Sequence, residues 1–188
     1  MKTSTKKPGG WSAIRPPLAT REKPALHALI KELYDAAAVN RDLLHARLLA
    51  GVNDGELLEK YRRKIVEQFF PTRGLIGKLK LGEARKAIRD YRKATGNIPG
   101  TAELLMTYVE NGTRFTREYG DIDERFYNSI ESALAELATL LRGEARGLYS
   151  QFAQRLATVE RMSDGIGWGF HDSIAAVVGS LEDELSGS

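Results

Sequence analysis

The segment IDERFYNSIESALAELATLL, residues 122–141, decides the fold class of this chain. Five of its apolar side chains recur at intervals of three and four residues: Phe126, Ile130, Leu134, Leu137 and Leu141. This spacing puts all of them on one face of an α-helix, whereas a half-buried β-strand would alternate apolar and polar residues. The segment therefore predicts an amphipathic helix that buries this face.

The same spacing recurs in block after block from residue 21 onward, and alternating strand patterns are nearly absent. We expect about eight helices, near residues 22–38, after Asn40, from Asn53 to Pro71, 81–95, 101–118, 122–141, after Gly143, and from Phe170 to Leu185. No unit repeats cleanly enough to assign a named solenoid. The sequence thus predicts an all-α fold, a single-domain array or irregular bundle of helices that can take a solenoid-like form.

The first two expected helices each carry an apolar face. In the helix near residues 22–38 this face holds Leu26, Leu29, Ile30, Leu33 and Ala37, and in the helix after Asn40 it holds Leu43, Leu44 and Leu48. The short link between them predicts a helical hairpin. We expect both faces to be buried.

Length and composition favour an ordinary globular protein. The chain has 188 residues, of which 42% are apolar and 28% charged, and it contains no cysteine. No apolar run approaches the roughly 18 residues that span a bilayer, and without cysteine there is no disulfide or thiolate site. We expect a cytoplasmic protein without a membrane partner, whose single helical domain covers residues 21–188.

The start of the chain differs from the rest. The first 20 residues hold four basic side chains, no acid, and Pro16 next to Pro17. Proline removes a backbone N–H donor and disfavours a helix. We therefore expect residues 1–20 to form a flexible basic tail.

Charge divides the chain into two halves. Residues 1–100 contain 21 Lys and Arg against 10 Asp and Glu, a net charge of +11. Residues 101–188 contain 7 Arg against 15 acids, a net charge of −8. Such a split favours one of two roles: a positive surface for a polyanion, or mutual attraction of the two halves within one chain or between copies.

The cations gather in the helices expected at 53–71 and 81–95 and in the loop between them. The candidates for an anion-binding or partner-binding patch are Lys60, Arg63, Lys64, Lys78, Lys80, Arg85, Arg89 and Lys93. If the two helices are neighbours, these side chains converge and can bind phosphates. The alternative is two solvated helix faces, because acids are interspersed with the cations. No aromatic residue is placed to stack on bases, which disfavours single-stranded nucleic acid.

One acidic segment suits a specific role: EYGDIDE, residues 118–124. Its candidate site residues Glu118, Asp121 and Asp123 offer the oxygen ligands that hard divalent cations prefer, or an acid and base pair. The alternative is structural: Gly120 ends the preceding helix, while Asp121 caps the next one and Glu124 completes a capping box.

A glycine-rich segment near the end of the chain reads GIGWGFHD, residues 165–172. Alternate glycines permit a sharp turn or the close approach of a ligand, and we expect Trp168 and Phe170 to anchor the loop in the core. His171 and Asp172 are metal-ligand types, but the other histidines lie on the first two expected helices. The alternative is a capping or buried, hydrogen-bonded His171. Whether a metal binds stays open, and no cofactor is expected.

Several motifs of the chain belong together. They are LEKY 58–61, ARKAI 84–88, YVENG 108–112, EYGDID 118–123, FYNS 126–129 and GIGWGFHD 165–172. In these motifs the chain resembles an uncharacterised bacterial family, a domain of unknown function, over roughly residues 50–180. The resemblance implies a bacterial, cytoplasmic, helical protein, and it assigns no catalytic residue.

Three functions are compatible with these observations. The residues favour a non-catalytic helical interaction module that uses charged surfaces to bind a protein partner or another copy. The alternative is a nucleic-acid-binding accessory protein that uses the basic patch. The third is a metal-dependent enzyme built from Glu118, Asp121, Asp123, His171 and Asp172.

Overall fold

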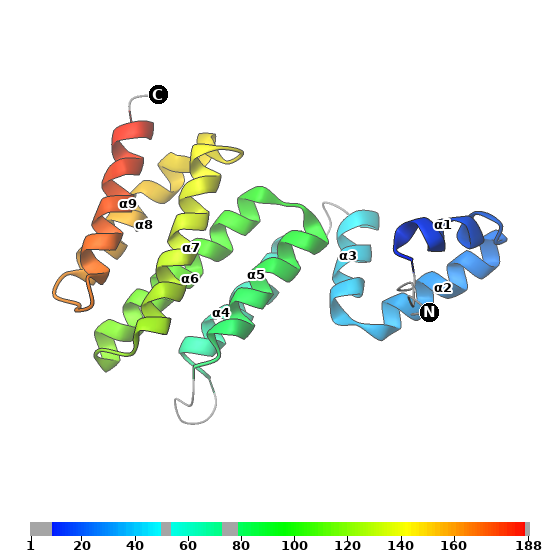
Figure 1. Ribbon diagram of the computed structural model, residues 1–188, viewed down its shortest axis with the longest axis horizontal. Coiled ribbons are helices and arrows are strands. Elements are labelled where there is room, and N and C mark those ends of the chain that lie inside the picture. The colour runs from blue at the N-terminus through cyan, green and yellow to red at the C-terminus, as the bar shows by residue number, and fades with distance from the viewer. Residues whose placement is uncertain (1–8, 50–53, 73–78, 187–188) are drawn as a thin grey trace, which may run out of the picture.

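The structure, a computed structural model, describes residues 9–49, 54–72 and 79–186 (Figure 1). These ranges contain α-helices, one short 3-10 helix and no strand: α1 (Trp11–Ala19), α2 (Lys23–Ala36), α3 (Ala38–Leu48), α4 (Asp54–Phe69), α5 (Leu81–Thr95), α6 (Ile98–Tyr119), α7 (Glu124–Arg142), η1 (Arg146–Leu148), α8 (Tyr149–Ser163) and α9 (Phe170–Leu185). The prediction of an all-α array of about eight helices is confirmed. The expected helix start at Asn53 lies outside the described residues.

Helices α4–α9 form three helical hairpins that stand side by side in two layers (Figure 1). Helix α6 packs on α4 and on α8 in one layer, and α7 packs on α9 in the other. In the second layer, α5 and α7 are joined by the ion pair between Arg85 and Glu136. One continuous apolar core lies between the layers, from Tyr61 to Leu185. We call α4–α9 the body of the protein.

Helix α6 is the centre of the body. It begins three residues earlier than expected because the Asn97 side chain accepts a hydrogen bond from the Gly100 N–H (2.8 Å), and proline at the second helical position, Pro99, is tolerated in a first turn. A Cβ atom at Gly112 would lie 2.2 Å from the Cδ1 of Ile130, so α6 and α7 approach too closely for any larger residue there. As predicted, Gly120 ends the helix, with φ +87°.

The N-terminal pair, α2 and α3, departs from the sequence prediction. No side chain of α2 is buried: Ile30 is 44% and Leu33 51% exposed, and Leu48 of α3 is 73% exposed. The two helices pack against each other, and α3 packs on α5, but no comparable contact covers α2 from another side within the described residues. The expectation that both apolar faces are buried is therefore wrong, because within the described residues no helix besides α3 packs extensively on α2.

Helix α1 was not expected. Pro16 and Pro17 lie inside it, so the interpretation that these prolines prevent a helix is wrong. The two missing N–H donors would have bonded the carbonyls of Ser12 and Ala13, four residues earlier, and both residues are exposed to water. Water can bind these exposed carbonyls, which lowers one part of the cost of proline inside a helix. Residues 1–8 of the expected tail lie outside the described residues.

Candidate interaction surface

In the structure, some cations of the predicted basic patch pair with acidic side chains and others stay exposed. Helices α4 and α5 are neighbours, as the patch required. However, Lys60 pairs with Asp42 of α3 (2.6 Å) and Arg85 pairs with Glu136 of α7 (2.9 Å). Burial and the nearby Lys60 lower the pKa of Lys64, whose amine lies 4.4 Å from the centre of the Tyr61 ring.

Four of the other candidate cations remain solvent-exposed. Within the described part of the chain, no ion pair is formed by Arg63, Lys80, Arg89 or Lys93. Lys78 lies outside the described residues. A groove that runs beside Lys64 is lined by Glu83 and Asp90 as well as by Lys86, so the surface between α4 and α5 carries both signs. Of the seven candidates within the described residues, Lys60 and Arg85 are therefore paired with acids, and acids also line the surface between α4 and α5.

Some of the cations of the first half form ion pairs with acids of the second half of the same chain. Arg62 reaches from the basic half to Glu103 (3.0 Å), and Arg92 joins Arg85 at Glu136 (3.8 Å). These contacts support attraction between the two halves within one molecule, the second of the two roles expected from the split. They also leave fewer cations free to bind a polyanion.

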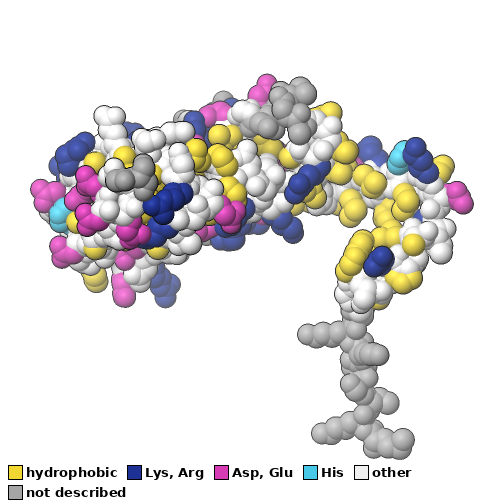
Figure 2. Space-filling model, turned by 90° about the horizontal axis from the view of Figure 1, so that it is seen from above, with side chains coloured by type: hydrophobic (Ala, Val, Ile, Leu, Met, Phe, Trp, Pro, Cys, Tyr) yellow, Lys and Arg dark blue, Asp and Glu magenta, His cyan; other side chains and the backbone are white. Residues whose placement is uncertain are grey.

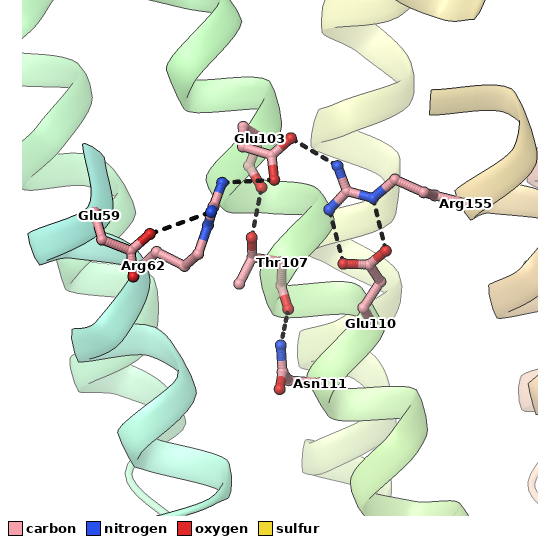
Figure 3. A network of polar contacts seen from close by, with 7 residues as sticks. All are labelled: Glu59, Arg62, Glu103, Thr107, Glu110, Asn111 and Arg155. Atoms are coloured by element: carbon pink, nitrogen blue, oxygen red, sulfur yellow. Dashed lines mark hydrogen bonds and ion pairs between the residues drawn. The ribbon is translucent and has the colours of Figure 1, made fainter. Parts of the chain in front are cut away.

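A polar network that the sequence does not predict joins α4, α6 and α8 (Figure 3). Arg155 donates two hydrogen bonds to Glu110 (2.7 and 2.8 Å) and one to Glu103 (2.6 Å), and Glu103 also accepts from Arg62 (3.0 Å). The two carboxylates raise the pKa of Arg155. Glu103 and Glu110 are seven residues apart, two helical turns on one face, which is the only sequence signal for the site. The network ties three helices of one layer together.

The two motif segments meet in space. A Cβ atom at Gly167 would lie 3.2 Å from the Oδ2 of Asp121, so the glycine-rich loop passes directly against the acidic segment. Arg117, just before that segment, donates to the carbonyls of Met162 (3.0 Å) and Asp164 (3.2 Å) at the start of the loop. Packing therefore explains why a glycine occupies position 167, because any side chain there would crowd Asp121.

The acids of the first motif already have structural partners. Asp123 caps α7 by accepting from the Phe126 N–H (2.8 Å), so the expectation that Asp121 is the cap is wrong. Asp121 instead accepts from the Tyr127 hydroxyl (3.0 Å), and Glu118 pairs with Arg114. With the cap at Asp123, Glu124 is the first helical residue and cannot complete a capping box.

His171 and its neighbours are likewise held in place. The His171 Nδ1 lies 2.9 Å from the Oγ of Ser163, and the Ser163 hydroxyl donates to the carbonyl of Glu160 (2.7 Å). Ser163 is fully buried, and its single proton is already donated, so it is not available as a nucleophile. This agrees with the hydrogen-bonded alternative for His171. Asp172 is exposed in the first turn of α9, where a negative charge is favourable.

The prediction that Trp168 anchors the glycine-rich loop in the core is wrong. Trp168 is 64% exposed and has φ +63°, the left-handed region that large residues rarely adopt. Phe170 is buried, as expected, and its ring lies 5.0 Å from that of Tyr127. Phe170, together with the partly buried Ile166, therefore holds this loop against the core.

The N-terminal pair is attached to the body through Asp42. This is the only buried residue of α3, and it accepts hydrogen bonds from the Tyr61 hydroxyl (2.7 Å) and the Lys60 amine (2.6 Å) of α4. Burial and the hydrogen bond to Asp42 raise the pKa of Tyr61. A buried carboxylate with two donors fixes α3 on α4 and leaves α2 projecting.

An apolar groove of about 410 Å³ runs between α2 and α3. Its lining residues are His27, Ile30, Lys31, Tyr34, Leu44, His45, Leu48 and Leu49. The Tyr34 hydroxyl lies 3.3 Å from the Nε2 of His45, so these two polar groups are paired with each other. Figure 2 shows hydrophobic side chains gathered over the N-terminal helices, and acidic side chains gathered toward the opposite end of this face. Three of the lining residues, Ile30, Leu44 and Leu48, are expected from the sequence to be buried, so their spacing gives no sign of an open groove.

Comparison of the chain with known protein families, with curated proteins and with solved structures finds no match. The resemblance of its motifs to a bacterial family therefore stays a prediction. Two absences hold for the described residues: no helix there is long and apolar enough to cross a membrane, and no three His, Asp or Glu side chains lie close enough to hold a metal ion. Function has to be argued from the geometry of the surface.

Proposed function

We propose that this chain is a non-catalytic helical interaction module that binds an amphipathic helix in the groove between α2 and α3. The observation that carries the proposal is the exposure of large apolar side chains along the groove, led by Leu48 at 73% and Leu49 at 47%. Soluble proteins rarely expose a contiguous apolar patch unless it binds something. A groove between two helices is a recurrent receptor for the apolar face of a third.

The motif segments have structural contacts that are consistent with a binding protein. Asp121, Asp123 and His171, which stand out in the sequence, each have a structural hydrogen-bond partner. Their contacts connect the end of α6 with α7 and with the loop before α9.

Site-specific photo-crosslinking tests the proposal. A photoreactive phenylalanine analogue placed at Ile30 or Leu48, which both line the groove, is expected to give a defined adduct in cells that naturally carry the protein. Mass spectrometry identifies the adduct. The Leu48→Glu substitution should abolish the adduct formed from position 30, because a carboxylate in the groove opposes an apolar ligand. The matched control position is Ala135, exposed on α7. Equal adducts at Ala135 and Ile30 would contradict the proposal.

Nucleic-acid binding is a second candidate because Arg89 and Lys93 lie one turn apart on the exposed face of α5. It predicts binding of duplex DNA or RNA that weakens steeply with salt. The Arg89→Ala, Lys93→Ala double variant should weaken binding further, while Arg85→Ala, whose guanidinium already pairs with Glu136, should matter less. An absence of binding at about 50 mM salt would eliminate this candidate.

A further inference from the structure

Helix α1 is an element on which no other helix packs extensively within the described residues. None of its side chains is buried, and Trp11 is 68% and Ile14 51% exposed. Trp11, Ile14 and Leu18 are spaced i, i+3 and i+7, so they share one face of the helix. The same chain therefore presents an apolar helical stripe and, separately, an apolar groove.

We propose that the helix bound in the groove is α1 of a second copy of this chain, and that the exchange is reciprocal. This inference rests on the proposed function, because it names the ligand of the same groove. Each copy donates its α1 and receives the other's, which gives a closed dimer with twofold symmetry. The exposed apolar side chains of α1 and of the α2–α3 groove are then covered together.

The dimensions of the two elements match. A helix of nine residues, the length of α1, extends about 13 Å. Along α2 the groove runs from His27 to Tyr34, two helical turns or about 10 Å. The stripe from Trp11 to Leu18 also covers two turns. A short amphipathic helix is thus the ligand that fits, rather than a long one or an extended strand.

Charge also permits two copies to meet at this surface. Helices α2 and α3 together hold four cations and three acids, and the only charged side chain of α1 is Arg15. These elements are nearly neutral although the first half of the chain carries a net charge of +11. Pairing through them avoids the like-charge repulsion that two copies of helix α5, with five cations and two acids, would face.

The link between α1 and α2 does not bring α1 into the groove of its own chain. Residues 20–22 span at most about 10 Å, which holds α1 beside the first turns of α2. The groove begins at His27 in this part of α2, yet α1 lines no part of it. The groove is therefore open to the α1 of a second copy.

Analytical ultracentrifugation of the full chain over about 1–200 μM tests the exchange, since short contacts of this kind give micromolar association. The wild type is expected to show a monomer–dimer equilibrium. Ile14→Glu in α1 and Leu48→Glu in the groove should each weaken dimerisation at least tenfold. The matched control is Trp168→Asp, which also replaces an exposed apolar side chain by a carboxylate but lies at the far end of the body, and it should dimerise as the wild type does. Circular dichroism checks that each variant is folded.

A mixing experiment separates exchange from any other dimer. The Leu48→Glu chain keeps an intact α1, and the Ile14→Glu chain keeps an intact groove. An equimolar mixture should therefore form heterodimers, held by one good contact, although neither variant dimerises alone. If the mixture stays monomeric while the wild type dimerises, the contact does not consist of α1 in the groove.

Other outcomes overturn the exchange in different ways. A wild type that is monomeric throughout, with Trp11 fluorescence altered by Leu48→Glu, would show that α1 fills the groove of its own chain. A monomeric wild type whose Leu48 crosslinks reach a different protein would overturn the exchange and leave the proposed function standing. A monomer without crosslinks from the groove would contradict both.

Discussion

The body and the N-terminal pair carry the same sequence pattern with opposite results. In α7 of the body, Phe126 and Leu137 recur at helical spacing and are 1% and 0% exposed. In α2 of the N-terminal pair, Ile30 and Leu33 follow the same spacing and are about half exposed. Hydrophobic periodicity therefore identifies an apolar face in both regions, but it does not say what covers that face.

The difference lies in the neighbours of each helix. Helix α7 packs on α6 and α9, which lie on two sides of it, whereas α2 packs on α3. Tertiary packing supplies most of the stability of a helix in a protein, and an amphipathic helix without a packing surface keeps an exposed stripe. Such an exposed stripe indicates a surface for a binding partner.

The largest predicted effect tests this contrast with one substitution in each region. Leu137→Ala should lower the free energy of unfolding by about 2–5 kcal/mol, because it opens a cavity in the core. Leu33→Ala, measured at a concentration where the chain is monomeric, should change it by less than about 0.5 kcal/mol. Urea unfolding of both variants checks the prediction. Similar losses would mean that α2 is packed as tightly as the body.

Much of the fold was predictable from local signals. The expected helix at residues 81–95 matches α5, and Gly96 ends it with φ +65°, as a glycine after a helix predicts. Gly120 likewise ends α6. Local signals failed where two of them competed: Asp121 and Asp123 are both good caps, and only Asp123 lies where its carboxylate meets the N–H of Phe126.

The candidate site was much less predictable, because it depends on contacts between distant segments. No local pattern shows that Gly167 meets Asp121, that Arg155 holds two glutamates of α6, or that Glu136 neutralises Arg85. In the sequence, the cations of α4 and α5 and the two motif segments stand out as unusual. The sequence does not show which cations are paired across helices, and the apolar spacing in α2 and α3 is the same as that of a core helix.

The ion pairs of the two regions offer a second test of the comparison. Arg155→Met leaves Glu103 and Glu110 without their shared cation, and we expect a loss of about 2–3 kcal/mol. In the N-terminal pair, Lys31→Met removes an exposed ion pair to Asp35 and should cost less than about 0.5 kcal/mol. Thermal or urea unfolding at low and high salt measures both. An equal cost for the two substitutions would show that burial does not distinguish the regions.

The attachment of the N-terminal pair to the body is tested by Asp42→Ala. The substitution leaves the buried Tyr61 hydroxyl without an acceptor and frees Lys60, so we expect a loss of about 1–2 kcal/mol. Hydrogen exchange should accelerate in α2 and α3 while α6–α9 keep their protection. The exposed Asp35→Ala is the control. Faster exchange throughout the body would show that the two regions form one cooperative unit.

The smallest predicted effect concerns a carboxyl group that the body partly encloses. Burial raises the pKa of Glu131 on α7, although a hydrogen bond from Ser173 of α9 opposes the rise. Because the folded protein holds the proton more tightly than the unfolded chain, stability falls as pH rises from the unfolded pKa through the raised folded one. Glu131→Gln removes this cost and should be more stable than the wild type by a few tenths of a kcal/mol at pH 7. The gain should vanish at low pH, where the wild-type side chain is neutral in both states. Urea unfolding from pH 3 to 8 measures the gain, with the exposed Glu182→Gln as the control, and a gain that is independent of pH would show that the enclosed charge is not its cause.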